Sequence, residues 1–247
     1  MSPAIATRGS KYRSFERTFE SELRTPAATH SRNRHKTRYN WTVAYIREII
    51  TDGHPTLRKV AKKVSADELA DPLFQQLVDD MFLTMYEAPG IGLAAPQVNT
   101  SKRIFVVDLQ LREDDEDLEQ GKRHGPLVFV NPKFTQVEGE IESIEGCLSV
   151  PGMIGDLTRH ARVVCVALDR HGKRFEVEGS GLFGRCLQHE MDHLDGVLYT
   201  DKAKNVRPAV TDEEKAALVE VEGEAQAVER LAELRKEAPP EAAALPA

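Results

Sequence analysis

The segment Gln188–His193, with the sequence Q-H-E-M-D-H, carries side chains that could bind a metal ion and move a proton. If it is helical, the four residues from His189 to His193 turn through about 400°, so both imidazoles lie on one face. Glu190 then lies about 100° around the helix from His189, beside the ion. A carboxylate there can take a proton from water and pass it to a leaving amine, an effect worth roughly 10²–10⁴ in rate. The pattern alone leaves catalysis and ordinary core packing equally open.

Two other segments could complete such a site. In E-G-C-L-S, residues 145–149, a glycine lets the backbone approach a ligand, and Cys147 could reach the ion. One thiolate and two imidazoles leave a fourth position open, which is typical of a catalytic metal. G-I-G-L-A-A-P-Q, residues 90–97, is either a tight turn into a strand or a cradle for a substrate carbonyl closed by the amide of Gln97. Cys165 and Cys186 are interpreted as core packing, because one lies in an alternating strand and the other on a buried helix face.

These three segments resemble, in order and separation, the signature motifs of the peptide deformylase family, over roughly residues 45 to 200. The resemblance implies hydrolysis of the formyl group from the N-terminal formyl-methionine of new polypeptides, with release of formate. The roles that it implies are metal ligands at Cys147, His189 and His193, a general acid/base at Glu190, and donors to the formyl oxygen from the Gln97 side chain and the Leu148 backbone N–H.

The resemblance also implies a cofactor and a substrate pocket. The family commonly uses Fe²⁺, although Zn²⁺, Ni²⁺ or Co²⁺ can occupy the same ligands, so the ligand set does not choose the metal. The expected substrate contacts are Gly90, Ile91, Gly92 and Leu93, and the residues around Arg185 and Cys186 are further candidates for the apolar methionine pocket. Glu145 could orient a ligating histidine or be purely structural. Ile154 stands where many family members have a peptide-binding arginine, so we expect a weaker dependence on substrate length.

Apolar spacing predicts the elements that position these residues. The predicted elements are a helix over 69–86, strands over 103–109, 127–130, 133–142, 162–169 and 174–178, a helix over 181–195 with Gly196 in the left-handed position beyond it, and a helix over 211–236. The predicted class is α+β, with antiparallel or mixed sheets wrapped around a central metal-binding helix, an N-terminal amphipathic helix and a C-terminal helix.

Composition predicts three parts in the chain. Residues 1–40 carry nine Lys or Arg against three acids and almost no apolar periodicity, so they are either a basic disordered extension or a transit peptide. Residues 41–200 form the catalytic domain, and 201–247 form a helical extension whose end, rich in Pro and Ala, should fray. Residues 113–119 are acidic at six of seven positions, as in a solvated surface loop.

Charge and cysteine usage limit the partners and the compartment. A net charge of −7 argues against a specific nucleic-acid binder, and no apolar run is long enough for a membrane span. Three cysteines without a secretory signal indicate a reducing compartment. We expect a soluble protein of the bacterial cytoplasm, or of a mitochondrion or plastid if residues 1–40 are a transit peptide. The expected partners are N-formyl-methionyl nascent peptides and, in a second place, the ribosome.

Two rival functions share part of the pattern. A zinc endopeptidase also uses H-E-x-x-H, but one version needs a histidine at the position of Tyr199, and another needs Glu213 or Glu214 as the third ligand. Neither version uses Cys147 or the glycine-rich segment. The other rival is a non-catalytic protein of the same fold that docks on the ribosome through its basic first 40 residues.

Overall fold

The computed structural model describes residues 44–110 and 125–210, and its strands form two antiparallel sheets. The larger sheet has the order β1-β2-β3-β6-β7, and the smaller has the order β4-β5-β8. Their bounds are β1 Gly92–Ala94, β2 Ile104–Val107, β3 Leu127–Glu138, β4 Ile141–Cys147, β5 Val150–Arg159, β6 Arg162–Leu168, β7 Arg174–Ser180 and β8 Lys204–Pro208. The predicted α+β class with antiparallel sheets is confirmed.

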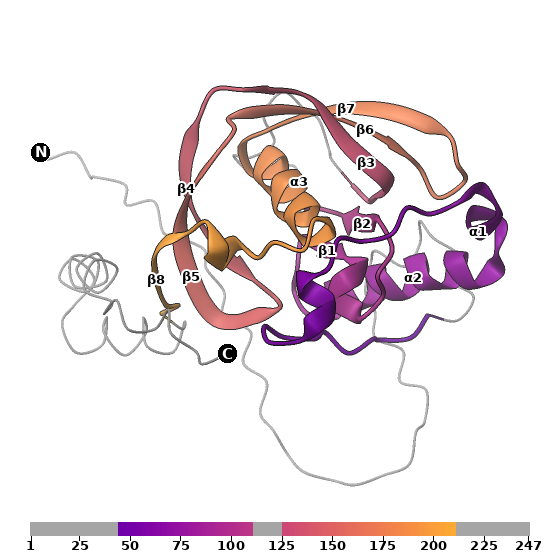
Figure 1. Cartoon of the computed structure of the whole chain (residues 1–247), viewed down its shortest axis with the longest axis horizontal. Coiled ribbons are helices and arrows are strands. Elements are labelled where there is room, and N and C mark those ends of the chain that lie inside the picture. The colour runs from indigo at the N-terminus through magenta and orange to yellow at the C-terminus, as the bar shows by residue number, and fades with distance from the viewer. Residues whose placement is uncertain (1–43, 111–124, 211–247) are drawn as a thin grey trace, which may run out of the picture. The chain divides into compact units, whose positions relative to one another are not determined.

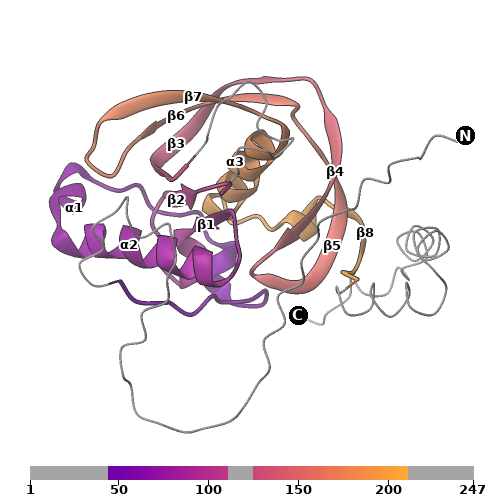
Figure 2. The ribbon, with the colours of Figure 1, turned by 180° about the vertical axis from the view of Figure 1, so that it is seen from behind.

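Helix α3, Gly181–Leu194, lies between the two sheets in both views of the chain (Figures 1 and 2). Its apolar side packs against one face of the larger sheet, where Phe105, Phe129 and Leu187 are fully buried. Gly196 has φ +75°, which fits the predicted left-handed position that ends the helix. The only other long helix of the described ranges, α2 at Pro72–Glu87, packs against the opposite face of β1 and β2. The part of the larger sheet formed by β1 and β2 is therefore covered on both faces.

The predicted helix over 69–86 is divided in the structure into α1, Ala66–Ala70, and α2. Asp71 is extended, at φ −70° and ψ 126°, and its side chain accepts a hydrogen bond from the backbone N–H of Leu73. The following Pro72 disfavours helical geometry at the residue before it but suits the first position of a new helix. The sequence spacing was continuous across this break because both helices turn their apolar sides to the same core.

The strands around Cys147 differ from the prediction. The run over 127–130 and the first part of the run over 133–142 form one strand, β3, that ends at Glu138, with register shifts between Val130 and Lys133 and between Phe134 and Gln136. The last two residues of the second run belong to β4. The prediction has no strand for β5, which pairs with β4 and places Gly155, Leu157 and Arg159 on the buried side. Strand β5 was missed because its glycines, proline and charged residues dilute the apolar alternation. The β4–β5 hairpin carries Cys147 to the metal-site side of α3.

The small sheet continues past the predicted end of the catalytic domain at residue 200. Tyr199–Asp201 form a 3-10 turn, η5, and β8 then pairs with β5. The start of the predicted C-terminal helical extension is therefore corrected, since residues 204–208 are a strand that completes the sheet. The predicted helix over 211–236, the basic segment 1–40 and the acidic segment 113–119 lie outside the described residues. No helix within 44–110 or 125–210 is long and apolar enough to cross a membrane.

Candidate metal and catalytic site

The structure brings Cys147, His189 and His193 together. Their sulfur and nitrogen donor atoms all lie within 4.8 Å of one another, and Cys147 Sγ is 3.2 Å from His193 Nε2. The histidines come from successive turns of α3, and the cysteine is the last residue of β4. A thiolate and two imidazoles at this spacing suit a divalent transition metal of the Fe²⁺ to Zn²⁺ series, with room for a further ligand. The residues present therefore fit the metal site that the sequence predicts.

The segment ending in Gln97 approaches the same place from the other side. Gln97 is 2% exposed, and its Oε1 accepts a hydrogen bond from the backbone N–H of Ala94 at 2.8 Å. That bond turns the Nε2 donor toward Ser149 Oγ at 3.3 Å and Cys147 Sγ at 3.6 Å. Leu148 lies in the two-residue turn between β4 and β5, where its backbone N–H is outside the ladder of strand pairs. Both predicted oxyanion donors thus lie next to the cysteine.

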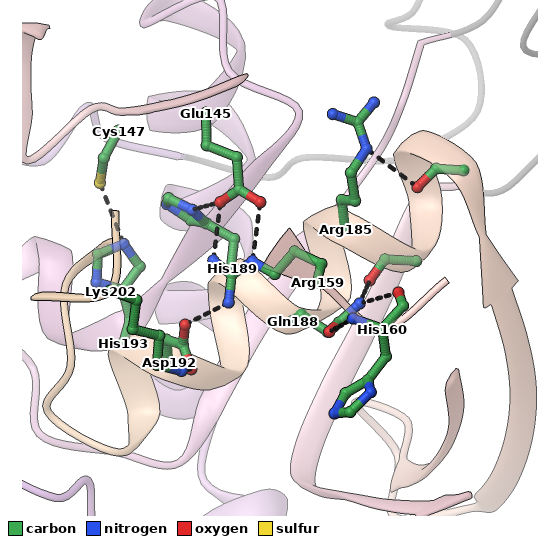
Figure 3. A network of polar contacts seen from close by, with 12 residues as sticks. Glu145, Cys147, Arg159, His160, Arg185, Gln188, His189, Asp192, His193 and Lys202 are labelled. Atoms are coloured by element: carbon green, nitrogen blue, oxygen red, sulfur yellow. Dashed lines mark hydrogen bonds and ion pairs between the residues drawn. The ribbon is translucent and has the colours of Figure 1, made fainter. Parts of the chain in front are cut away.

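Glu145 connects the site to the interior (Figure 3). Its Oε2 lies 3.0 Å from His189 Nδ1, so this carboxylate contacts one of the predicted metal ligands. Arg159 holds the same carboxylate with two bonds of 2.8 Å and reaches Asp192 Oδ2 at 2.6 Å. A carboxylate on Nδ1 fixes the orientation of the ring and leaves Nε2 for a ligand. Sequence patterns missed Arg159, which ends the strand that they did not predict.

The carboxylate of Glu190 is buried beside the glycine-rich segment. The residue is 4% exposed, and Oε2 has no hydrogen-bond partner among the described residues. A Cβ atom placed on Gly92 would lie 2.5 Å from Glu190 Oε1 and 2.9 Å from Cys186 Sγ. The carboxylate can therefore occupy this position only because Gly92 has no side chain. An unpartnered buried carboxylate is costly, which favours a role in binding or proton transfer.

Burial and charge set the protonation of these groups. Burial is the largest effect on Glu190 and raises its pKa to about 7, within the range of a general acid/base at neutral pH. Burial alone would also raise the pKa of Glu145, but the hydrogen bonds of Arg159 and His189 outweigh it and lower that pKa to about 2. Glu145 is therefore ionised at neutral pH, whereas Glu190 can exchange a proton there.

The two histidines are affected differently. Burial holds the pKa of His193 well below its ordinary value, so this ring is neutral, as a ligand must be. Burial also acts to lower the pKa of His189, but hydrogen bonds with Cys147 and Glu145 outweigh it and raise the pKa to about 10. Because metals bind the free base, a cation and a proton compete for His189.

A cavity of about 500 Å³ opens onto Cys147, His189 and Glu190. Gly90, Ile91 and Gly92 line it, as do Arg185 and Cys186 from α3. Leu93, the remaining predicted substrate contact, is not brought to the cavity. It is fully buried in the cluster under α2, because successive residues of β1 face opposite sides of the sheet. Cys165 is fully buried in the core, as expected, while Cys186 both packs in the core and lines the cavity.

Two further features of the site had no signal in the sequence. Tyr199 is 1% exposed, and its ring stacks on that of His189 at a centroid distance of 6.2 Å. The extended chain that precedes the 3-10 helix η2 (Pro55–Arg58) makes two backbone hydrogen bonds to the site. Ile50 N–H donates to Gln97 O at 2.9 Å, and Asp52 N–H donates to Ser149 O at 2.8 Å. This chain ties the glycine-rich segment to the β4–β5 turn. Neither residue type nor spacing foretells such backbone contacts.

The rival endopeptidase site has no support from the described residues. Cys147 occupies the place of a third ligand, and Tyr199 packs on His189 through its ring. Glu213 and Glu214, the downstream ligands that this rival needs, lie outside the described residues.

Comparison with known proteins shows which family the chain resembles. Residues 46–209 match the family model described as polypeptide deformylase. A peptide deformylase from Symbiobacterium thermophilum is 45% identical over 185 residues, covering 74% of this chain and 79% of the relative. Another from Thermodesulfovibrio yellowstonii is 50% identical over 146 residues, covering 59% and 82%.

Solved structures give the same result. The crystal structure of a peptide deformylase from Legionella pneumophila is 37% identical, with a TM-score of 0.57, covering 79% of this chain and all of the other. A class I type b peptide deformylase from Acinetobacter baumannii with Met-Ala-Ser bound is 33% identical, with a TM-score of 0.58, covering 65% and 99%. The fold, the three signature segments and the family match agree, so this chain belongs to the polypeptide deformylase family.

Proposed function

We propose that this chain performs the reaction of its family, hydrolytic removal of the formyl group from N-formyl-methionyl peptides, with Cys147, His189 and His193 as the ligands of a catalytic metal. The observation that carries the proposal is the meeting of three ligand atoms within 4.8 Å at the edge of a cavity that the buried Glu190 also lines. A divalent ion at these ligands supplies Lewis acidity, which makes water a stronger nucleophile toward the formyl carbon.

The protein groups divide the remaining work among them. The Gln97 Nε2–H and the Leu148 backbone N–H would donate to the formyl oxygen as it gains negative charge. Their place beside Cys147 supports this role. Glu190 would take a proton from the attacking water and deliver it to the methionine nitrogen as the C–N bond breaks. Glu145 and Arg159 would keep His189 oriented, a role supported by the bonds between them.

The methionine side chain would enter the cavity between Ile91 and Cys186, which come from the glycine-rich segment and from α3. Their apolar surfaces suit a thioether chain, since burial of each CH₂ contributes about 0.8 kcal/mol. The main chain of the peptide would then follow the gap between Gly90 and the β4–β5 hairpin. Apolar side chains and few, well-placed polar groups are typical of such sites.

The metal in this proposal is Fe²⁺, with Zn²⁺, Ni²⁺ and Co²⁺ able to take the same ligands. An iron–thiolate site is expected to lose activity in air, because oxidation of Cys147 or of the metal destroys the ligation. Metal analysis of protein purified without oxygen identifies the native ion. Loss of activity with a chelator and its return with one added ion type supports the assignment, and full activity of metal-free protein contradicts it.

The decisive assay is formate release from a formyl-Met-Ala amide by anaerobically purified protein, compared with Glu190→Ala at equal metal content. We expect the substitution to reduce kcat by roughly 10²–10⁴. Activity that survives the substitution removes the mechanism. No activity in either protein with metal bound favours the non-catalytic alternative.

The natural substrates would be nascent chains that begin with formyl-methionine, in the bacterial cytoplasm. The bacterial origin of the relatives supports this compartment. Docking on the ribosome through residues 1–40 stays a prediction, as does import into a mitochondrion or plastid. Mass spectrometry of the mature N-terminus distinguishes a retained basic segment from a cleaved transit peptide.

A further inference from the structure

The cavity has one strongly basic side chain that no described carboxylate neutralises. Arg185 is the only arginine or lysine among the described residues that line it. Its Nε donates over 3.4 Å to the carbonyl oxygen of Gly181, and Figure 3 shows no contact of its outer nitrogens with the other residues drawn. Within the described ranges, the arginines that do pair with carboxylates are Arg47, Arg58, Arg103, Arg159, Arg162, Arg170 and Arg207. Arg185 is therefore available to a ligand.

Arg185 lies one helical turn before His189 on α3, and the bond of its Nε to Gly181 O directs the guanidinium toward the start of the helix, at the outer part of the cavity. Arg185 and His189 are four residues apart on the helix, so they lie one turn from each other on the same side, with Cβ atoms about 5–6 Å apart. Leu182 and Cys186 line the cavity from the same helix. A side chain that fills the apolar part of the cavity would therefore lie near Arg185, and we expect the next residue of the peptide to lie toward the outer part of the cavity, where the guanidinium is.

The wall opposite Arg185 offers no competing positive charge. The hairpin side of the cavity is lined by Ile144 and Met153, and Ile144 is 46% exposed. Ile154 does not line the cavity, and its neighbour across the strands, Arg207, is buried in an ion pair of 2.8 Å with Asp156. Glu145, His189 and Glu190 also line the cavity, at its metal-site end, so Arg185 is the positive side chain of the described lining that lies away from those groups.

We propose that Arg185 is a specificity-determining residue that binds a carboxylate carried by the substrate beyond its formyl-methionine. This inference rests on the proposed function. In a nascent chain the carboxylate is an Asp or Glu side chain near position 2, and in a short peptide it can also be the C-terminus. Guanidinium and carboxylate form paired charge-assisted hydrogen bonds. Because Arg185 is partly exposed, solvent screens the pair, and we expect a preference of about two- to fivefold in kcat/KM.

The test compares formyl-Met-Glu amide, formyl-Met-Ala amide, formyl-Met-Lys amide and formyl-Met-Ala with a free carboxylate, at low ionic strength. Wild-type protein should favour the Glu amide over the Ala amide by the factor above, and the preference should shrink in 0.5 M salt, at a Debye length of about 4 Å. Arg185→Gln should bring the ratio to about one, and Arg185→Glu should favour the Lys amide. Arg174→Gln is the matched control, because Arg174 is exposed on β7 and does not line the cavity. It should keep the wild-type ratio.

The four peptides distinguish an internal carboxylate from a C-terminal one. They also distinguish failure of this inference from failure of the proposed function. A preference for the Glu amide supports recognition of an internal side chain, whereas a preference confined to the free acid overturns it for nascent chains. A ratio that Arg185→Gln leaves unchanged overturns the assignment to Arg185. Hydrolysis of all four peptides at equal rates by the wild type defeats this inference alone. Metal-loaded protein that hydrolyses none of them defeats the proposed function.

Discussion

The sharpest consequence of the structure concerns Gly92→Ala. A methyl group there would lie 2.5 Å from Glu190 Oε1 and 2.9 Å from Cys186 Sγ. Both distances are shorter than the van der Waals contact of a methyl carbon with a non-bonded oxygen or sulfur atom. The carboxylate end of Glu190 can turn away, so the protein should still fold. Overpacking of this kind costs about 1–3 kcal/mol of stability, and we expect the lower part of that range. The displaced carboxylate should lose its contribution to proton transfer, so kcat falls by roughly 10²–10⁴.

A double-mutant cycle with Glu190→Ala tests whether the loss acts through the carboxylate. If it does, Gly92→Ala should change the residual rate of Glu190→Ala by less than about threefold, because the two effects are not additive. Glu190→Ala also removes the closest clash and leaves the one with Cys186 Sγ, so the double mutant should be more resistant to urea than Gly92→Ala. The measurements are formate release at saturating peptide and equilibrium unfolding at equal metal content.

Gly179→Ala is the matched steric control. A Cβ at Gly179 would lie 2.9 Å from Leu187 Cδ1 and 3.0 Å from the Cα of Gly184, among groups that carry no charge. It should cost stability without the selective fall in kcat. If Gly92→Ala keeps kcat within about threefold of the wild type, or if its effect and that of Glu190→Ala simply add, then Gly92 does not act by making room for the carboxylate.

Three more substitutions probe the neighbouring groups. Gln97→Ala should lower kcat by about 10²–10³ with a small change in KM, because one donor to the oxyanion is lost, and an equal rise in KM would contradict this. Glu145→Gln should weaken metal affinity by about 10–100-fold in competition with a chelator, because Glu145 Oε2 contacts His189 Nδ1, and unchanged affinity would show that this contact does not support the ligand. Arg159→Met should lower the free energy of unfolding by about 3–5 kcal/mol, since the buried Glu145 loses its partner. Adding Glu145→Leu should restore part of that loss, and no recovery in urea unfolding would mean that the cost arises elsewhere.

The sequence by itself identified the residues that we propose for the chemistry of the site. H-E-x-x-H fixes the relation of His189, Glu190 and His193 through helix geometry, which is local and needs no information about the rest of the chain. The two glycine-containing segments are recognisable for the same reason, since a residue type at a fixed short spacing carries the signal. The helix over 181–195 and its end at Gly196 followed from apolar periodicity and a left-handed glycine.

Only the tertiary structure decided how these pieces meet. The support of His189 by Glu145 and Arg159 depends on β5, whose weak alternation hides it from sequence patterns, and on a pairing register that sets which face each residue takes. Leu93 and Gly92 are neighbours in a motif, yet the pleat sends one into the core beneath α2 and the other to Glu190. Long-range contacts depend on burial and on charge pairing between segments that are far apart in the sequence. The spacing of residues within a short segment carries no information about either.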